Sequence, residues 1–341
     1  MTQNKLALLG FGNVGQALAR LLLGKRKELA DRYGIEFSVT GIATGSHGRA
    51  IDAEGIDLDA ALAAMQKGSS LDELSTNSIA TSIEFIEGCG ADVFFENTAV
   101  SYVDGQPALD HLRRALELGM HSITANKGPV VFGYRELSDL AEKKGKKFLF
   151  ESTVMDGAPV FSVFREALPA ANVRSFRGIL NSTTNSILSQ MEEGQSLEEA
   201  IAYAQSIGIA ETDPSGDVEG WDAAIKVSAL ATVLMNSPIK PDEVERKGIE
   251  DFTPEMISQA KAEGKRWKLI CSAKREGDKV LAKVAPEMVG AESAFYSIEG
   301  TTSMVSFESD VLGELSLIEK NPGPETTAYG LLADFVNAVS Q

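Results

Sequence analysis

Cysteine and histidine are both scarce in this sequence of 341 residues, which holds two of the first and three of the second. Cys89 and Cys271 cannot form a disulfide framework or a thiolate zinc site, which favours a reducing compartment. The histidines are scattered singly and offer no cluster of the kind that zinc requires; they are His47, His111 and His121. The composition therefore argues against a disulfide-stabilised secreted protein and against a zinc enzyme.

Long apolar runs and an excess of positive charge are missing as well. No run approaches the roughly 18 apolar residues that a membrane-spanning helix requires. The opening residues MTQNKLALLG lack the basic start and the cleavage site of a secretory signal. The formal net charge of −17 leaves no excess of lysine and arginine to bind nucleic-acid phosphates. We therefore expect a cytoplasmic protein with a small-molecule substrate, and neither a membrane nor a nucleic acid as partner.

Residues 1–150 alternate between short apolar runs and helical patterns. Apolarity that continues without alternation is typical of strands buried on both faces of a sheet. Helical spacing follows the first run and recurs at 107–119 and 134–144. Strands that alternate with helices predict an α/β domain with a Rossmann-like, doubly wound parallel sheet. The predicted strands are 5–10, 37–44, 92–98, 121–124 and 146–153.

Residues 151–326 show another order of elements, which predicts an α+β domain for catalysis, substrate binding and dimerisation. A helical pattern at 327–341 follows this domain and is a candidate for packing back against the first domain. Within the second domain, the helical patterns are 157–169, 183–194 and 196–208, and the strand-like runs are 173–180, 279–289 and 302–310.

A glycine-rich turn follows the first predicted strand and fits the pattern G-x-G-x-x-G. The first glycine of this pattern permits a tight turn, the second admits a pyrophosphate, and the third lets helix and strand pack closely. The next helix directs unpaired N–H groups and the positive end of its dipole at the phosphates. Because the pattern ends a strand and opens an amphipathic helix, it predicts a bound dinucleotide. Its residues are Gly10, Phe11, Gly12, Asn13, Val14 and Gly15.

The residues after the second predicted strand bear on which dinucleotide binds. An acidic side chain at this place would hold the ribose hydroxyls of NAD. Thr44 stands there instead, and Ser46, His47 and Arg49 follow it. Hydroxyls and a guanidinium without a carboxylate favour NADP, with Arg49 at the 2′-phosphate. A polar loop that is indifferent to this phosphate, and hence NAD, remains the alternative.

The segment GWDAAIKV, at residues 220–227, places Asp222 and Lys226 four residues apart in an apolar helical pattern. Such a pair shares one helix face and contributes only about 0.3–0.5 kcal/mol when exposed, so stability explains it poorly. A site that reduces a carbonyl needs a cation or acid beside the oxygen. It also needs carboxylates to hold a substrate ammonium group. The pair supplies both groups.

Further polar residues accompany this pair in the sequence. Lys127 lies in the turn after the strand at 121–124, at the carboxyl edge of the sheet where ligands bind. Glu211 precedes the helix that carries Asp222, and a polar turn between a predicted strand and helix contains Asn181 and Thr183. Lysines and acids are thus the candidate catalytic groups, whereas no Ser/His/Asp arrangement is present.

The sequence resembles homoserine dehydrogenase at five places. They are the glycine turn, ENTAV at 96–100, TANKGP at 124–129, ILNSTTNSIL at 179–188 and AETDPSGDVEGWDAAIK at 210–226. The resemblance implies an enzyme that interconverts L-homoserine and L-aspartate 4-semialdehyde with NAD(P), on the route to threonine and methionine. It also implies a homodimer. The chain is similar to the short form, without a regulatory amino-acid-binding (ACT) domain or a fused aspartate kinase.

The resemblance implies roles for individual residues. Lys226 would donate and accept the proton at the hydroxyl or carbonyl oxygen, and Lys127 would assist between cofactor and substrate. Glu211 and Asp222 would bind the amino acid beside the polar turn of Asn181 and Thr183. Asn97 and Thr98, together with Lys127, would line the nicotinamide side.

The segment ESTVMDGAP at 151–159 matches the place where this family often holds a sodium ion. Oxygen ligands, mostly backbone carbonyls, suit such a hard cation. The implied ligands are Glu151, Val154, Asp156 and Ala158. Three features depart from the family pattern, namely Ser182 in place of glycine, Met155 with Asp156 in place of small residues, and a less glycine-rich stretch at 319–332. They leave open a related NAD(P) enzyme acting on another amino or hydroxy acid. A dinucleotide-sensing protein without turnover is the third alternative.

Overall fold

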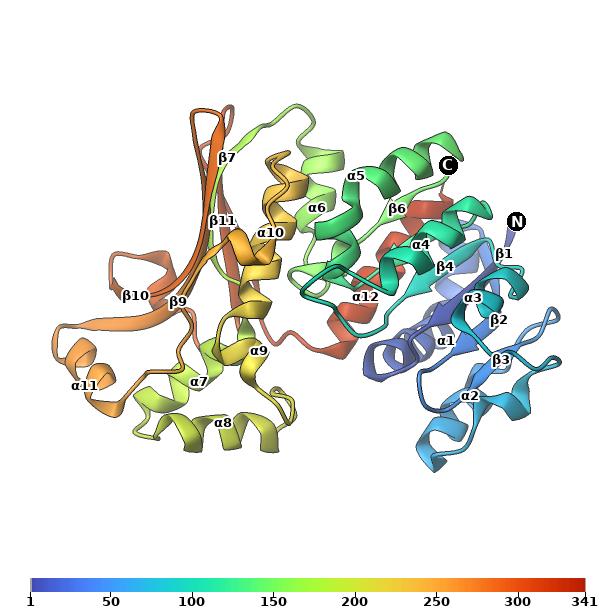
Figure 1. Cartoon of the computed structure of the whole chain (residues 1–341), viewed down its shortest axis with the longest axis horizontal. Coiled ribbons are helices and arrows are strands. Elements are labelled where there is room, and N and C mark those ends of the chain that lie inside the picture. The colour runs from blue at the N-terminus through green and yellow to red at the C-terminus, as the bar shows by residue number, and fades with distance from the viewer. Residues whose placement is uncertain (1, 341) are drawn as a thin grey trace. The chain divides into compact units, whose positions relative to one another are not determined.

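The computed structural model describes residues 2–340, which form two compact units. The first unit runs to Pro159 and resumes at Gly323, and the second spans Val160–Pro322. The last helix of the chain, α12 (Pro324–Val339), belongs to the first unit, where it packs against α1 (Asn13–Tyr33) (Figure 1). No helix among the described residues is long and apolar enough to cross a membrane.

The first unit contains a six-stranded sheet in the order β3-β2-β1-β4-β5-β6. All neighbours are parallel except β3, which runs antiparallel to β2, so the predicted doubly wound parallel sheet is confirmed. Strand order reverses at β1, because β2 flanks it on one side and β4 on the other. Ligands of open α/β sheets bind at the carboxyl ends of strands beside such a reversal. The strands are β1 (Thr2–Leu9), β2 (Ile35–Ala43), β3 (Arg49–Ile51), β4 (Val93–Glu96), β5 (His121–Thr124) and β6 (Phe148–Leu149).

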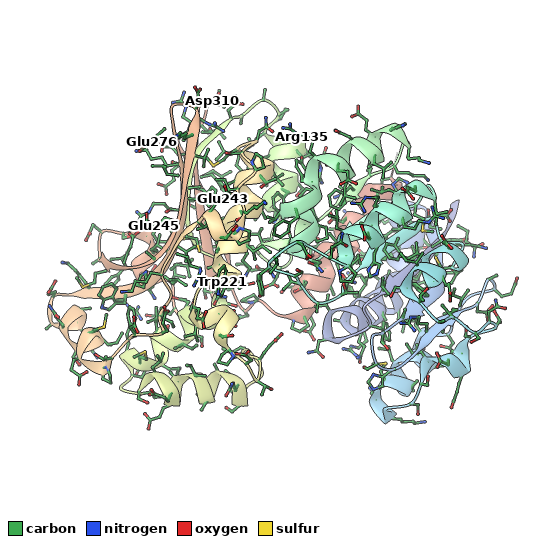
Figure 2. The ribbon with its side chains drawn as sticks, viewed as in Figure 1. Arg135, Trp221, Glu243, Glu245, Glu276 and Asp310 are labelled. Atoms are coloured by element: carbon green, nitrogen blue, oxygen red, sulfur yellow. The ribbon has the colours of Figure 1, made fainter. Side chains whose placement is uncertain are left out.

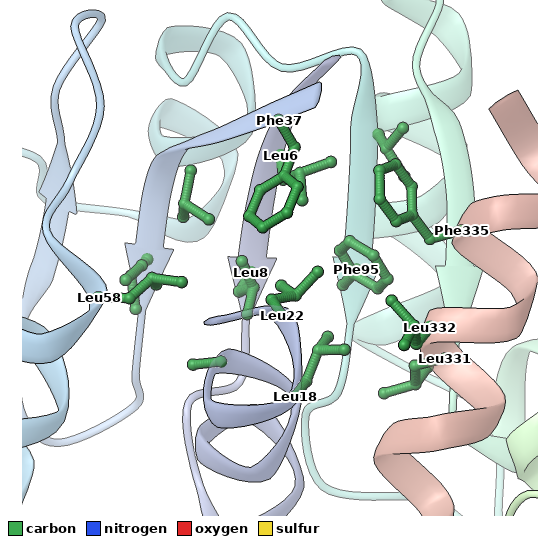
Figure 3. Close-up of a cluster of buried hydrophobic side chains, with 14 of the residues drawn as sticks. Leu6, Leu8, Leu18, Leu22, Phe37, Leu58, Phe95, Leu331, Leu332 and Phe335 are labelled. Atoms are coloured by element: carbon green, nitrogen blue, oxygen red, sulfur yellow. The ribbon is translucent and has the colours of Figure 1, made fainter. Parts of the chain in front are cut away.

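Helices cover both faces of this sheet (Figure 1). Helix α1 packs against α12, and α4 packs against α3 and α5. Apolar side chains of α1 and α12 meet those of β1, β2 and β4 in one core (Figure 3), in which the ring of Phe335 stands edge-on to Phe37 and to Phe95. Burying each such side chain stabilises the fold by about 1.5–3 kcal/mol. The remaining helices are α2 (Leu58–Lys67), η1 (Leu71–Leu74), α3 (Ser82–Gly88), α4 (Ala108–Glu117), α5 (Lys127–Lys143) and η2 (Glu151–Thr153).

Two sequence-based predictions for this unit are wrong in their bounds. The strand expected at 146–153 contains only Phe148–Leu149, because the chain then turns into a 3-10 helix held by α12. There the backbone N–H of Glu151 donates to Asp334, and the hydroxyl of Ser152 donates to a carbonyl of α12. The helix expected at 134–144 begins earlier, at Lys127, since the side chain of Asn126 caps it. Apolar runs alone do not distinguish a strand from a buried turn.

The second unit is built on a mainly antiparallel sheet in the order β12-β11-β7-β9-β10-β8. Only β8 runs parallel to its neighbour, β10. Helices α7, α10 and α11 pack on β9, and α10 also packs on β10. The predicted α+β class is thereby confirmed. The strands are β7 (Val173–Ile179), β8 (Glu245–Arg246), β9 (Lys265–Glu276), β10 (Lys279–Gly290), β11 (Ser303–Ser309) and β12 (Glu314–Glu319).

The helices of the second unit follow the sequence pattern closely, with one exception. The helix expected at 157–169 is a short α-helical turn followed by a π-helical turn. Ser196 and Glu199 form a capping box at the start of α8, in which each side chain accepts from the backbone N–H of the other residue. The elements are α6 (Val160–Ser162), η3 (Val163–Ala167), α7 (Ser182–Glu192), α8 (Leu197–Ser206), α9 (Ser215–Val218), α10 (Trp221–Leu234), η4 (Pro241–Glu243), α11 (Pro254–Ala262) and η5 (Ala294–Ser297).

Candidate functional site

The glycine turn lies at the strand reversal of the first sheet, directly after β1. Gly10 has φ +96°, and a Cβ there would lie 2.3 Å from the carbonyl oxygen of Asn97. A Cβ at Gly15 would lie 2.4 Å from the carbonyl oxygen of Gly10. At Gly12 a Cβ would meet no heavy atom within 4 Å. The outer glycines are therefore required by packing, whereas Gly12 borders open space at the start of α1, as a pyrophosphate site needs.

Asn97 and Thr98 follow β4, on the other side of the reversal. The backbone N–H of Asn97 donates to Leu9 at 2.8 Å, which fixes this loop beside the glycine turn. Both side-chain amide atoms of Asn97 are buried without a hydrogen-bond partner among the described residues. A buried polar group left unpaired costs about 1–3 kcal/mol. Such a group at a ligand-binding edge is best explained by a ligand with both a donor and an acceptor.

Lys127 is the first residue of α5 and is partly exposed. Asn126 precedes it as the N-cap, with its side-chain oxygen accepting from the backbone N–H of Gly128 at 3.0 Å. The amide nitrogen of Asn126 donates to the carbonyls of Thr98 at 3.1 Å and Ala99 at 3.2 Å. These bonds tie the start of α5 to the loop after β4. The sequence predicted Thr98 and Lys127 as site residues, and the structure brings the segments that contain them together.

The loop between β2 and β3 contains the residues expected to distinguish NADP from NAD. Thr44 is buried, and its hydroxyl accepts from the backbone N–H of His47 at 2.6 Å. Arg49 starts β3, and its Nε is buried without a partner among the described residues. Asp72 of η1 also reaches this loop, where its carboxylate accepts from the backbone N–H of Arg49 at 2.8 Å. That bond lowers the pKa of Asp72, and the hydroxyl of Ser70 lowers it further. The sequence analysis did not predict Asp72 as a residue of this site, because it lies in η1, 23 residues after Arg49.

In the second unit, Asp222 and Lys226 lie in the first two turns of α10, a helix that is buried on nearly all sides. The ammonium of Lys226 lies 2.9 Å from the carboxylate of Asp222 and donates to the carbonyl of Leu180 at 2.7 Å. The two side chains are only 14% and 12% exposed. The pair is therefore a partly desolvated cluster between α10 and the end of β7, and not a solvated surface pair.

Asn181 extends this cluster from the N-cap position of α7. Its side-chain oxygen accepts from the backbone N–H of Thr184 at 2.7 Å, which orients the amide group. The amide nitrogen then donates to Asp222 at 2.9 Å and to Asp217 at 2.6 Å. Asp217 lies in the first turn of the short helix α9 and was not among the residues that the sequence predicted for the site. The structure places it in the cluster because α9 turns back toward α7.

Two other predicted substrate residues are not joined to this cluster by hydrogen bonds of their side chains in the structure. The hydroxyl of Thr183 donates to the carbonyl of Ile209 at 3.0 Å. Glu211 is exposed, and its backbone carbonyl accepts from Gln205 at 3.0 Å. Trp221, at the start of α10 (Figure 2), packs under the guanidinium of Arg246, 3.6 Å from the ring centroid, as a packing residue would.

The two cysteines are buried, and the segment 151–159 implied as a cation site follows β6. Burial raises the pKa of Cys89 to about 11 and that of Cys271 to about 12, so neither is a thiolate near neutral pH. No group of three or more His, Cys, Asp or Glu side chains suited to a metal ion occurs among the described residues. Asp156 has φ +38°, and its carboxylate accepts from Thr327 at 2.6 Å. Glu151 and Val154 are buried nearby in the same segment.

The chain is similar to known proteins over nearly its whole length. A family model described as homoserine dehydrogenase matches residues 159–336, and one described as its NAD-binding domain matches residues 10–151. An NAD(+)-dependent homoserine dehydrogenase of Pseudomonas canavaninivorans is 36% identical over 99% of this chain and 96% of its own. A homoserine dehydrogenase of Methanocaldococcus jannaschii is also 36% identical, over 97% of each chain. The crystal structure of a putative homoserine dehydrogenase from Archaeoglobus fulgidus superposes with a TM-score of 0.87 at 32% identity, covering 99% of this chain and 100% of that one.

Proposed function

This chain belongs to the homoserine dehydrogenase family, an NAD(P)-dependent oxidoreductase family acting on a CH–OH group, and we propose that Lys226 transfers the proton in its reaction. The reaction interconverts L-homoserine and L-aspartate 4-semialdehyde. The observation that carries the proposal is the partly desolvated ammonium of Lys226, oriented by Asp222 and by the carbonyl of Leu180.

The proposed chemistry divides between proton and hydride. When bound, the dihydronicotinamide supplies the hydride to the aldehyde carbon. Lys226 donates a proton to the aldehyde oxygen, where negative charge develops, and a hydroxyl group results. In the opposite direction the amine of Lys226 accepts the hydroxyl proton. Lys127, at the start of α5, is proposed to assist between cofactor and substrate.

Carboxylates are proposed to bind the substrate ammonium group. Asp222 is positioned for this by Asn181, which donates to it at 2.9 Å. Asp217, which accepts from the same amide, adds negative charge to the cluster. Glu211 and the polar turn with Thr183 are proposed to complete the substrate contacts. Charge-assisted hydrogen bonds of this kind contribute about 1.5–3 kcal/mol each.

The assay that tests this function follows NADPH and NADH absorbance with purified protein and L-aspartate 4-semialdehyde. A panel of related aldehydes, including one without the α-ammonium group, tests the substrate assignment. Turnover of the semialdehyde at least tenfold faster than any other aldehyde is expected. Equal turnover of the deaminated aldehyde would contradict the proposed role of the carboxylates.

The dinucleotide is proposed to bind along the carboxyl edge of the first sheet. The open space at Gly12 and the unpartnered amide of Asn97 support this placement. The motif residues Gly10, Phe11, Asn13, Val14 and Gly15 would shape the pyrophosphate site, and Thr98 would contact the nicotinamide side with Asn97. The loop at Arg49 would face the ribose.

Arg49 is proposed to favour NADP over NAD. Arg49→Ala is expected to lower the NADP/NAD ratio of kcat/KM about tenfold or more, since a charge-assisted hydrogen bond contributes roughly 1.5–3 kcal/mol. Asp72→Asn is the matched comparison, because it changes the carboxylate beside the same loop. If the ratio does not change in Arg49→Ala, this residue does not read the 2′-phosphate. A selective loss of NAD turnover in Asp72→Asn would indicate that the carboxylate binds ribose hydroxyls.

A sodium ion is proposed at the segment Glu151–Ala158. Glu151 lies in the 3-10 helix η2 of this segment, and the carboxylate of Asp156 accepts from the hydroxyl of Thr327. Hard monovalent and divalent cations prefer such oxygen ligands. Thermal unfolding in NaCl and in choline chloride of equal ionic strength tests the proposal. A higher Tm in sodium that Asp156→Asn abolishes would support it, and identical curves would contradict it.

A homodimer is proposed as the working form. Several large apolar side chains on the strands of the second sheet are exposed, among them Leu281, Met288 and Ile318. Exposed apolar surface of this kind marks protein–protein contacts when it is contiguous. Light scattering after size exclusion is expected to give twice the mass of the 36.4 kDa chain.

The reaction is proposed to serve threonine and methionine biosynthesis in the cytoplasm. Expression in a strain that lacks homoserine dehydrogenase activity is expected to restore growth without homoserine. The same complementation with Lys226→Ala is expected to fail. Growth that depends on added homoserine despite soluble wild-type protein would contradict the pathway assignment.

A further inference from the structure

Glu96, the last residue of β4, is a fully buried acid that the proposed reaction does not use. Three polar groups converge on Oε1 of its carboxylate. They are the backbone N–H and the hydroxyl of Thr98, with the N–H at 3.3 Å, and Nδ1 of His111 from α4 at 3.5 Å. A buried charge persists only when it is well hydrogen-bonded. Glu96 directly precedes Asn97, whose side-chain amide is unpartnered among the described residues.

The chemistry of a carboxylate fixes the direction of the protons around it. An ionised carboxylate has no proton to donate, so each of its neighbours must donate. The hydroxyl proton of Thr98 therefore points to Glu96, and Nδ1 of His111 carries the ring proton. The oxygen of Thr98 is then left with lone pairs only. Toward any further group, Thr98 acts as an acceptor.

Glu96 also connects this loop to the start of α5. Its backbone carbonyl accepts from the hydroxyl of Thr124 at 2.7 Å, and Oε2 lies 3.5 Å from the same hydroxyl. The oxygen of Thr124 accepts in turn from the backbone N–H of Asn126 at 2.9 Å. Asn126 caps the helix that begins with Lys127. One buried acid thus orients two hydroxyls at the ends of adjacent strands.

We propose that Glu96 is a positioning residue that holds the hydroxyl of Thr98 as a hydrogen-bond acceptor for the carboxamide N–H of the bound nicotinamide. The proposal rests on the dinucleotide site described above. A primary carboxamide carries both donors and an acceptor. The unpartnered amide of Asn97 beside Thr98 offers the complementary pair. Without Glu96 the hydroxyl of Thr98 rotates freely and presents its proton as readily as its lone pairs.

The test measures binding of NAD and of an analogue in which an acetyl group replaces the carboxamide. The acetyl group keeps the carbonyl acceptor and lacks the N–H donors. Titration calorimetry without substrate gives Kd for both ligands, so the readout does not depend on turnover. In the wild-type protein the analogue is expected to bind about tenfold more weakly, since a neutral hydrogen bond contributes about 0.5–1.5 kcal/mol.

Glu96→Met, which removes the acceptor but keeps side-chain length, is expected to reduce this Kd ratio to below about threefold. Thr98→Val, which removes the hydroxyl, is expected to reduce it equally, and Glu96→Met in the Thr98→Val background is expected to reduce it no further. Ser122→Ala is the matched control. Its hydroxyl is fully buried in the adjacent strand without a partner among the described residues, so the ratio is expected to stay at the wild-type value.

The outcomes separate this inference from the proposed function. An unchanged Kd ratio in folded Glu96→Met would show that Glu96 is only a structural residue. Should that variant fail to fold, Thr98→Val and Thr98→Ser decide, because a ratio retained in Thr98→Val excludes Thr98 as the acceptor. If the wild-type protein binds neither ligand, the dinucleotide site itself is wrong. If it binds both and the ratio does not respond, only the role of Glu96 fails.

Discussion

Two lysines of the second unit lie in similarly apolar surroundings but have different partners. Lys226 on α10 is held by the carboxylate of Asp222 and retains 14% exposure of its side chain. Lys268 on β9 is fully buried, and its ammonium donates to the side-chain oxygen of Asn185 and to the carbonyl of Ile298. Lys226 thus has a carboxylate as its partner and is partly accessible to solvent. Lys268 has neutral hydrogen-bond partners and no exposed surface.

We expect this difference in environment to separate Lys226, the proposed proton-transfer lysine, from a structural lysine. Burial, and after it the nearby guanidinium of Arg266, lower the pKa of Lys268 from its ordinary value near 10.5 to about 8. Lys268 nevertheless has no route to a substrate, because its side chain has no exposed surface. It connects α7 to the segment after η5. Burial in apolar sequence therefore does not by itself identify a catalytic lysine. The partners of its ammonium group and the exposure of its side chain distinguish the two cases.

The largest expected effect comes from removing the proposed proton-transfer lysine. Lys226→Ala is expected to lower kcat by about 10²–10⁴, the usual scale for a general acid–base group. Lys226→Arg is not expected to restore activity, because a guanidinium does not release its proton near neutral pH. Steady-state kinetics with circular dichroism as a check of folding measure this. Lys279→Ala, at an exposed lysine of β10, is the matched control. Near-normal kcat in a folded Lys226→Ala would contradict the proton-transfer role.

Removing the structural lysine is expected to change stability and its pH dependence instead. The folded pKa of Lys268 lies below its unfolded value, so the unfolded state binds more protons between about pH 8 and 10.5. Wild-type stability is therefore expected to rise across this window relative to Lys268→Met, by at most about 3 kcal/mol for a shift of this size. Urea unfolding of both proteins at pH 7.5 and pH 10 measures the difference.

The same variant sharpens the comparison through its kinetics. In Lys268→Met, kcat at pH 7.5 is expected to stay within about twofold of the wild-type value, the scale of a group outside the reaction. A stability difference that is equal at both pH values would contradict the lowered pKa. A fall in kcat comparable to that of Lys226→Ala would mean that the two lysines do not differ as their surroundings indicate.

A smaller effect is expected from neutralising the partner of Lys226. Asp222→Asn keeps the shape of the side chain but removes the charge that faces the ammonium of Lys226 and that is proposed to bind the substrate. We expect kcat/KM for homoserine to fall about tenfold, since a hydrogen bond to a charged group contributes about 1.5–3 kcal/mol and the amide retains part of it. The Kd of the dinucleotide is expected to be unchanged. A lowered dinucleotide affinity would place Asp222 in a different role.

Much of this architecture could be predicted from local sequence patterns. The run of apolar residues before Gly10 and the helical spacing after Gly15 predicted a strand, a turn and a helix, and the structure confirms all three. The motifs that include Lys127 and Lys226 predicted the family, which the comparisons confirm. These predictions succeeded because periodicity and turn geometry are properties of neighbouring residues. The short strand at Phe148–Leu149 was mispredicted because contacts with α12 ended it.

The sequence by itself determined the fold class of each unit, the glycine turn and the placement of Asp222 and Lys226 one helical turn apart, since these follow from spacing along the chain. Only the tertiary structure decided which polar groups meet. It brought Asp217 to Asn181, Asp72 to the backbone of Arg49, and Nδ1 of His111 to Glu96. The physical reason is that hydrogen bonds between separate elements depend on how those elements pack. The partners of a carboxylate in other elements are therefore set by the fold and leave no periodic trace in the sequence.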